Sequence, residues 1–184
     1  MIFVPTRLPG VFEVQLDRKL DERGFFARTW CQKEFADHGL SPRLAQCSIS
    51  FNPVRGTLRG MHYQEAPHQE AKLVRCTRGA IWDVALDLRS DSPAFGKWVG
   101  ATLSAENRGA VYIPEGCAHG FISLEENSEV FYQISEFYNG QPSRGVRWND
   151  PAFGIDWPVE VRQISERDRT YPDYQYSNGF AETV

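Results

Sequence analysis

The stretch RGTLRGMHYQ, residues 55–64, has the pattern of a β-strand, yet it carries side chains that a strand filling only a core does not need. Alternation places every second side chain on the same face of a strand, so Arg59 and Met61 should share one face and His62 the other. A histidine on such a mostly apolar face is either a satisfied core residue or a functional group. This stretch alone leaves both interpretations open.

Short apolar or alternating runs continue through the rest of the chain, separated by turns rich in glycine and proline. We expect strands at FEVQL (12–16), KLVRC (72–76), AIWDVALDL (80–88), WVGATL (98–103), GAVYIP (109–114), GFISL (120–124) and EVFYQISEFY (129–138). Many short strands of this kind predict an all-β sandwich or barrel. One short helix is expected around residues 30–36, ending near Gly39.

The length and net charge of the chain limit the number of domains and the kinds of ligand that we expect. At 184 residues it can form one well-buried core, so we expect a single domain over residues 1–184 with a flexible polar tail at 177–184. The net charge of −4, without a basic cluster, argues against nucleic-acid binding but allows a small anionic ligand.

Export and membrane signals are missing from the sequence. The N-terminal residues MIFVPTRLPG have no signal-peptide core, and no apolar run approaches the roughly 20 residues of a membrane span. The four cysteines show no C-x-x-C spacing. We therefore expect a cytoplasmic protein with reduced thiols and no membrane partner.

Two separated stretches carry related signals: the one around His62 and Gln64, and GAVYIPEGCAHG, residues 109–120, which contains His119. Together they resemble the paired motifs of the cupin jelly roll, which implies an all-β double-stranded β-helix with a few short helices. Metal-binding cupins have a second histidine where Gln64 stands and a carboxylate in the region of Lys72. Because an amide replaces imidazole poorly and a cation repels a divalent metal, we expect no metal and no cofactor. His62 and His119 should then line one metal-free cavity.

From about residue 2 to residue 173, the chain resembles the dTDP-4-dehydrorhamnose 3,5-epimerase family of nucleotide-sugar epimerases. The resemblance implies a homodimeric, metal-free isomerase acting on C3, C5 or both carbons of a nucleoside-diphosphate 4-keto-6-deoxyhexose. It rests on several motifs in the same order: DERGFFARTW (21–30), GTLRGMHYQ (56–64), AKLVRC (71–76), GAIWDVALDLRSDSPAFGKW (79–98), LSAEN (103–107), YIPEGCAHGF (112–121), WNDPAFGIDWP (148–158) and SERD (165–168).

Epimerisation beside a ketone needs a base on one face of the sugar, an acid on the other and a group that holds the enolate oxygen. His62 is the natural base, since an imidazole is largely neutral at pH 7. The resemblance implies that Asp168 orients this imidazole, that Tyr132 is the acid and that Lys72 holds the oxyanion. Each has a plainer alternative: Asp168 and Lys72 as solvated surface residues, Tyr132 as a core residue.

Further positions match substrate contacts of the family. Arg23 and Arg59 match positions that contact the nucleotide, and a guanidinium suits a diphosphate bidentately. Tyr138 is expected to be a stacking surface for the base or the sugar. The other expected substrate contacts are Phe26, Arg28, Gln46, Ser48, His119 and Arg167.

Four positions depart from the family pattern. Arg28 and Ser143 stand where glutamates are expected, Ser48 replaces an asparagine, and Arg167 replaces a lysine. An arginine only donates hydrogen bonds, so Arg28 inside the base pocket would favour cytosine or guanine over thymine. If Arg28 turns to solvent or to the diphosphate, backbone groups still read thymine. The sequence therefore leaves the nucleobase open between dTDP and CDP or GDP.

Two rival functions remain. The first is an enzyme of the same fold that inverts one centre or isomerises the ketone. The second is a cupin-like sugar-binding module without catalysis. An opposed acid and base favour catalysis, since binding alone requires neither.

Overall fold

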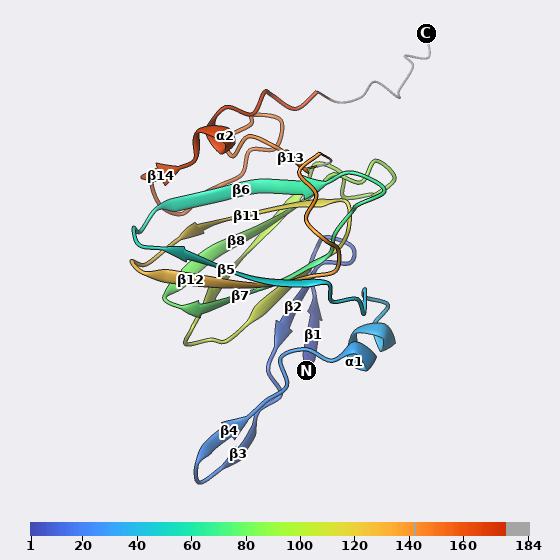
Figure 1. Ribbon diagram of the computed structural model, residues 1–184, viewed down its shortest axis with the longest axis vertical. Helices are drawn as coiled ribbons and strands as arrows, with labels where there is room; N and C mark the ends of the chain where they lie inside the picture. The colour runs from blue at the N-terminus through green and yellow to red at the C-terminus, as the bar shows by residue number, and fades with distance from the viewer. Residues whose placement is uncertain (142, 176–184) are drawn as a thin grey trace.

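The computed structural model describes residues 1–141 and 143–175, and within them two antiparallel sheets face each other (Figure 1). The first sheet has the order β1 (Ile2–Pro5), β2 (Phe12–Gln15), β10 (Ala110–Ile113), β7 (Lys72–Arg78), β12 (Ser128–Ile134) and β5 (Gln46–Asn52). The second has the order β13 (Ser143–Gly145), β6 (Thr57–Gln64), β11 (Cys117–Ser123), β8 (Ala80–Asp87) and β9 (Trp98–Ser104). This arrangement is a jelly roll, as the paired motifs predict.

The strands alternate between a core shared by the two sheets and a separate outer layer. In β10, Val111 and Ile113 point into the shared core, whereas Ala110 and Tyr112 point outward. The outward residues pack against Phe35 of α1 (Gln32–Asp37), the short helix expected near this position. The first sheet is therefore covered on both faces at β10, whereas its edge strands β1 and β5 stay largely exposed.

The C-terminal part of the chain covers the outer face of the second sheet. Val146, Phe153 and Ile155 pack on Met61 and Val84 of that sheet. The chain then adds β14 (Gln163–Ile164) in parallel to β6 and forms α2 (Glu166–Arg169) beside it. The side chain of Ser165 accepts a hydrogen bond from the backbone N–H at position 168, which caps the helix and fixes where its side chains point.

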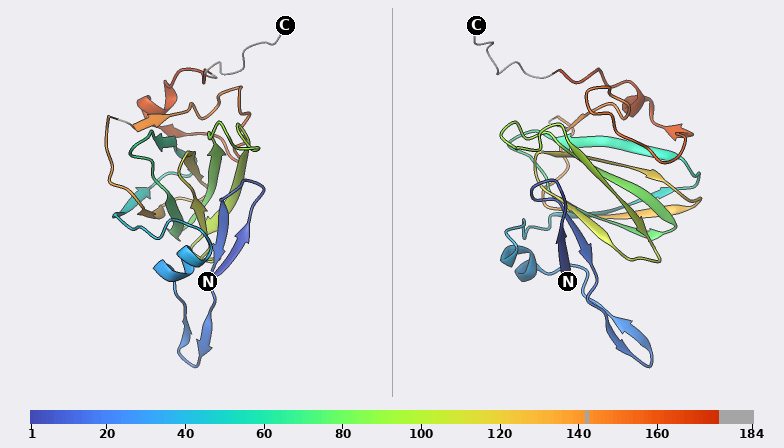
Figure 2. Two further views of the ribbon diagram at one scale, coloured as in Figure 1. Left: turned by 90° about the vertical axis from the view of Figure 1, so that its right-hand side faces the viewer. Right: turned by 180° about the vertical axis from the view of Figure 1, so that it is seen from behind.

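A hairpin of β3 (Lys19–Asp21) and β4 (Gly24–Phe26) projects from the body of the molecule (Figure 2). Its apolar side chains are open to solvent: Leu20 is 80% exposed and Phe26 is 72% exposed. No helix of the described residues is long and apolar enough to span a membrane. The expected flexible tail at 177–184 lies outside the described residues.

Candidate active site

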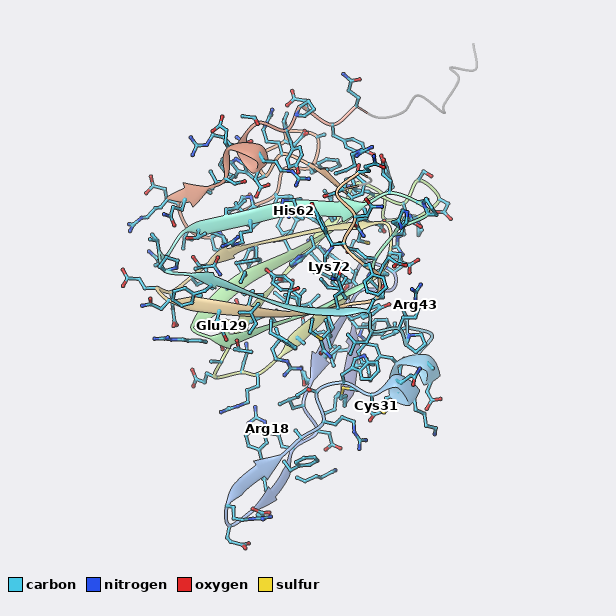
Figure 3. All side chains as sticks on the ribbon, viewed as in Figure 1. Arg18, Cys31, Arg43, His62, Lys72 and Glu129 are labelled. Carbon is cyan, nitrogen blue, oxygen red and sulfur yellow. The ribbon has the colours of Figure 1, made fainter. Side chains whose placement is uncertain are left out.

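A cavity of about 830 Å³ opens between the two sheets, close to α2. Both sheets contribute to its walls, and Figure 3 shows two of the contributing residues, His62 of β6 and Lys72 of β7. The structure brings together nine of the side chains singled out from the sequence: Ser48, Arg59, His62, Lys72, His119, Tyr132, Tyr138, Arg167 and Asp168.

His62 and Asp168 form a hydrogen-bonded pair on one wall. Nε2 of His62 lies 2.7 Å from Oδ1 of Asp168, and Oδ2 of the same carboxylate accepts a hydrogen bond from the backbone N–H of Gly60 at 3.2 Å. The carboxylate is 6% exposed, while the imidazole is 40% exposed. Burial alone would raise the pKa of Asp168, but the hydrogen bonds and charge of His62 bring that pKa below its ordinary value. An ionised carboxylate therefore backs an imidazole that faces the cavity.

A β-bulge places Arg59 on the same cavity as His62. His62 pairs with His119, but Arg59 pairs with Phe121, so β6 contains one more residue than β11 between these pairs. The expectation that alternation separates Arg59 from His62 was wrong, because the bulge resets the alternation. Met61 instead points away, fully buried under the C-terminal segment.

Gly60 lies inside this bulge, at a φ of +117°. A Cβ atom at this position would lie 2.5 Å from the Cα of Gly120 on β11. Only glycine fits such an approach of two backbones. The glycine at position 60 thus has a structural cause, and the bulge that contains it directs Arg59 and His62 to one site.

Tyr132 lies on β12 in the opposite sheet. Its hydroxyl is 3.1 Å from Oγ of Ser50, and its ring makes an edge contact with His119, with centroids 6.1 Å apart. Burial raises the pKa of Tyr132 well above its usual range, so the phenol stays protonated. As expected from alternation, Val130 and Ile134 share its face, one in the core and the other on the cavity.

His119 belongs to a second histidine–carboxylate pair that the sequence did not indicate. Its Nε2 lies 2.7 Å from Oδ2 of Asp83, and both residues are buried. Among the described residues, Oδ1 of Asp83 has no hydrogen-bond partner. No short-range motif joins positions 83 and 119; the pairing arises because β8 and β11 are neighbours in the sheet.

Lys72 places an ammonium group in the cavity rather than in solvent. The residue is 8% exposed, and its Nζ lies 2.5 Å from Oε1 of Glu70. Gln64 is also buried, and its amide is engaged by neighbouring groups, including that glutamate. Gln64 and Lys72 occupy the positions where a cupin metal site would need an imidazole and a carboxylate. The donor set therefore does not fit a divalent metal. No cluster of three metal-ligating side chains occurs within residues 1–141 and 143–175.

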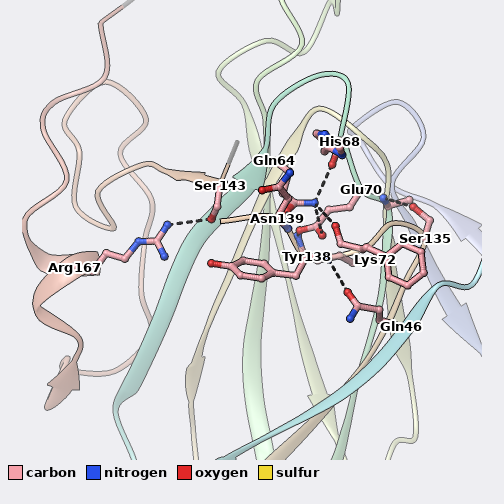
Figure 4. A network of polar contacts seen from close by, with 12 residues as sticks. Gln46, Gln64, His68, Glu70, Lys72, Ser135, Tyr138, Asn139, Ser143 and Arg167 are labelled. Atoms are coloured by element: carbon pink, nitrogen blue, oxygen red, sulfur yellow. Dashed lines mark hydrogen bonds and ion pairs between the residues drawn. The ribbon is translucent and has the colours of Figure 1, made fainter. Parts of the chain in front are cut away.

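The mouth of the cavity carries the groups expected to bind a nucleotide. Nε of Arg59 donates to Oδ1 of Asn52 at 2.8 Å, which fixes the guanidinium at the edge. Tyr138 is 64% exposed, and its backbone N–H donates to Oε1 of Gln46 at 2.6 Å. Gln46 therefore holds the backbone of the Tyr138 loop. Near the hydroxyl end of Tyr138, Arg167 donates to Oγ of Ser143 at 3.0 Å (Figure 4).

Besides Gln46, which binds the backbone of the Tyr138 loop, three expected substrate contacts do not line this cavity within the chain. Arg23 and Phe26 lie on the projecting hairpin, where Arg23 pairs with Asp21 at 2.5 Å. Arg28 follows the hairpin and its guanidinium lies 3.3 Å from Oε1 of Glu34. None of these three residues lines the cavity of its own chain.

The two walls together can move protons on opposite faces of a bound carbon acid. The half-exposed imidazole on the second sheet can accept a proton, and the protonated phenol on the first sheet can donate one. The buried ammonium group can stabilise an oxyanion formed between them. Such a set suits proton exchange at a carbon beside a carbonyl group.

Comparisons with known proteins agree with this chemistry. The model of the dTDP-4-dehydrorhamnose 3,5-epimerase family matches residues 5–175. The dTDP-4-dehydrorhamnose 3,5-epimerase of Methanothermobacter thermautotrophicus is 44% identical over 172 residues, covering 92% of this chain and 92% of that protein. The crystal structure of the enzyme of that name from Elizabethkingia anophelis has a TM-score of 0.91 and 40% identity, covering 95% of this chain and 96% of that one. The Bacillus anthracis enzyme, solved with TDP and PPi bound, has a TM-score of 0.89 and 35% identity, covering 94% and 99% of the two chains.

Proposed function

Because the chain belongs to the dTDP-4-dehydrorhamnose 3,5-epimerase family, we propose that it inverts C3, C5 or both carbons of a nucleoside-diphosphate 4-keto-6-deoxyhexose through an enolate. The enzyme is an isomerase. One observation carries the proposed mechanism: the His62–Asp168 pair and the Tyr132 phenol lie on facing sheets of the same cavity.

His62 acts as the base in this mechanism. Its Nε2 faces Asp168, so the tautomer with the proton on Nε2 donates to the carboxylate and leaves Nδ1 unprotonated. Nδ1 takes the proton from the carbon beside the C4 ketone, and the electron pair of that C–H bond moves into the enolate. Asp168 stabilises the imidazolium that results.

Tyr132 and Lys72 complete the inversion. The ammonium group of Lys72 stabilises the negative oxygen of the enolate, where charge develops in the transition state. Tyr132 then donates its proton to the opposite face of the carbon, which restores the ketone with inverted configuration. The phenolate recovers a proton from solvent while the His62 imidazolium releases its proton to solvent, so no net proton is consumed.

The nucleotide binds at the mouth of the cavity in this proposal. Arg59 contacts the diphosphate, and Tyr138 offers an exposed ring for stacking. Arg167 supplies a further cation beside Ser143, and Ser48 and His119 line the space for the sugar. We place the reaction in the cytoplasm, since the four cysteines are free in the structure.

We further propose that the enzyme is a homodimer in which the hairpin of each chain reaches the cavity of its partner. Leu20 and Phe26 expose apolar surface on this hairpin, which a partner chain would cover. Arg23 and Arg28 can act as substrate contacts only from such a position, because they do not line the cavity of their own chain. Mixing His62→Ala with Arg23→Ala tests this, since mixed dimers regain one complete site and hence activity. Absence of any gain from mixed dimers would contradict the shared site.

The decisive experiment uses 4-keto-6-deoxy sugars linked to dTDP, in deuterated water, with NMR of C3 and C5. We expect deuterium at both carbons with inversion. Deuterium at one carbon identifies a single-centre epimerase, and a displaced carbonyl identifies a ketoisomerase. Binding without exchange would contradict the proposed activity and leave the sugar-binding module.

A further inference from the structure

Glu70 has no role in the mechanism above, although it forms an ion pair with Lys72, which has one. Its Oε1 lies 2.5 Å from Nζ of Lys72, and the Glu70 and Lys72 side chains are only 10% and 9% exposed. A charged pair so poorly solvated is held more tightly than a surface pair, because water competes little for either partner. The carboxylate therefore fixes the direction in which the four-carbon side chain of Lys72 places its ammonium group.

Gln64 connects this ion pair to the opposite sheet. Its Nε2 donates to Oε2 of Glu70 at 3.2 Å and to the carbonyl oxygen of His68 at 2.8 Å. The same amide contacts the loop that carries Tyr138: Nε2 lies 3.3 Å from the carbonyl oxygen of Phe137, and Oε1 accepts from the N–H of Asn139 at 2.7 Å (Figure 4). One buried side chain thus joins the oxyanion end of the cavity to its nucleotide end.

We propose that Glu70 is a positioning residue that holds Lys72 toward the enolate oxygen, and that Gln64 couples this position to the Tyr138 loop. Glu70 transfers no proton in this role; it acts only through Lys72. The inference rests on the proposed epimerase function. It assigns a role to Gln64, which the sequence offered only as part of a failed metal site, and to its buried partner Glu70.

The first test truncates Glu70. We expect Glu70→Ala to lower kcat on the order of 100-fold, because Lys72 is no longer held near the reacting oxygen. The Kd for dTDP, which lacks the sugar, should stay near its wild-type value. Glu70→Gln should give an intermediate kcat, since its amide oxygen still accepts from Lys72 while its NH₂ group faces Nε2 of Gln64. The matched control is Glu65→Ala, which removes an exposed carboxylate of the same loop that pairs with Arg144.

A double-mutant cycle separates positioning from a general loss of structure. In a Lys72→Ala background, adding Glu70→Ala should change kcat no further, because its effect passes through Lys72. Gln64→Leu should lower kcat and raise the Kd for dTDP, since it removes the hydrogen bonds of this side chain to Glu70 and to the Tyr138 loop. Thermal unfolding of each variant accompanies the kinetics, and the Glu70 variants carry the test if Gln64→Leu does not fold.

The outcomes that overturn the inference are distinct from failure of the proposed function. Absence of deuterium exchange in the wild-type enzyme would contradict the function itself. Exchange in the wild type with an unchanged or increased kcat in Glu70→Ala would contradict the positioning role alone. Equal losses from Glu70→Ala with and without Lys72 would also overturn it, because they would show that Glu70 acts elsewhere.

Discussion

Nε2 of His62 lies 2.7 Å from Oδ1 of Asp168, although 106 residues separate them in the chain. The contact exists because α2 packs beside β6, where the backbone N–H of Gly60 also binds the Asp168 carboxylate. The base and the group that orients it thus come from a strand of the second sheet and from the segment that covers that sheet.

Removing His62 should stop the proton transfer, and removing the charge of Asp168 should slow it. We expect His62→Ala to abolish deuterium exchange at both C3 and C5, because no other group is proposed to act as the base. Asp168→Asn should lower kcat by roughly 100- to 10,000-fold, since it removes the charge that stabilises the imidazolium. NMR in deuterated water measures both, and substantial exchange in purified His62→Ala would remove His62 from this role.

Tyr132→Phe should separate exchange from inversion. The variant keeps the ring but loses the phenolic proton, so we expect it to bind substrate and retain some deuterium exchange while inversion is lost. Burial raises the pKa of Tyr132, so ionisation of the phenol should not limit the wild-type rate at neutral pH. The matched control is Tyr112→Phe, a buried tyrosine whose hydroxyl accepts from the N–H of Ser41 away from the cavity. Wild-type inversion in Tyr132→Phe would show that another group donates the proton.

The Asp168 carboxylate should also make the fold sensitive to acid. Its folded pKa is held below the ordinary value of about 3.9 by His62 and Gly60, despite burial that alone would raise it. This stabilisation is present above about pH 3.9 and is lost as the pH falls through the lower folded value. We expect the free energy of unfolding to fall less steeply below pH 4 in Asp168→Asn than in the wild type. Urea titrations at several pH values measure this, with the exposed Asp37→Asn as the control.

Metal removal should leave activity unchanged. Gln64 is bound to backbone groups and Lys72 to Glu70, so these positions offer no ligand pair beside His62 and His119. We expect full activity after chelation and no stoichiometric metal by elemental analysis. About one bound transition metal per chain, with activity lost on its removal, would contradict this expectation.

The nucleobase preference depends on Arg28. Its guanidinium pairs with Glu34 of its own chain, and we expect this ion pair to persist in the dimer and to keep Arg28 away from the nucleobase. We therefore expect dTDP to bind at least about tenfold more tightly than CDP or GDP, a difference of roughly 1.4 kcal/mol. Dissociation constants for dTDP, UDP, CDP and GDP in one buffer measure this, because diphosphate binding depends on salt. Equal or tighter binding of CDP or GDP would show that Arg28 reads the base after all.

The local sequence was sufficient to predict secondary structure wherever the hydrophobic pattern depends on residues that are close together in the chain. Alternation and turn residues identified most of the central strands, and the segment before Gly39 was identified as a short helix. The paired motifs predicted the jelly roll, and the ordered motifs predicted the family. The hairpin at Lys19–Phe26 and the strand Gln46–Asn52 were missed, because exposed apolar residues in them do not follow a buried-face pattern.

The sequence by itself determined the all-β class, because hydrophobic patterning is a local property. Through the resemblance of its ordered motifs to a known family, it also indicated the jelly roll, the family and the types of chemical group available. Only the tertiary structure decided how these groups meet. The bulge between Arg59 and His62 resets which side chains face the cavity, and no count of alternating residues reveals it. The Asp83–His119 pair and the Gln64–Glu70–Lys72 network arise from strand neighbours and loop packing, so their partners become visible only when distant segments are placed side by side.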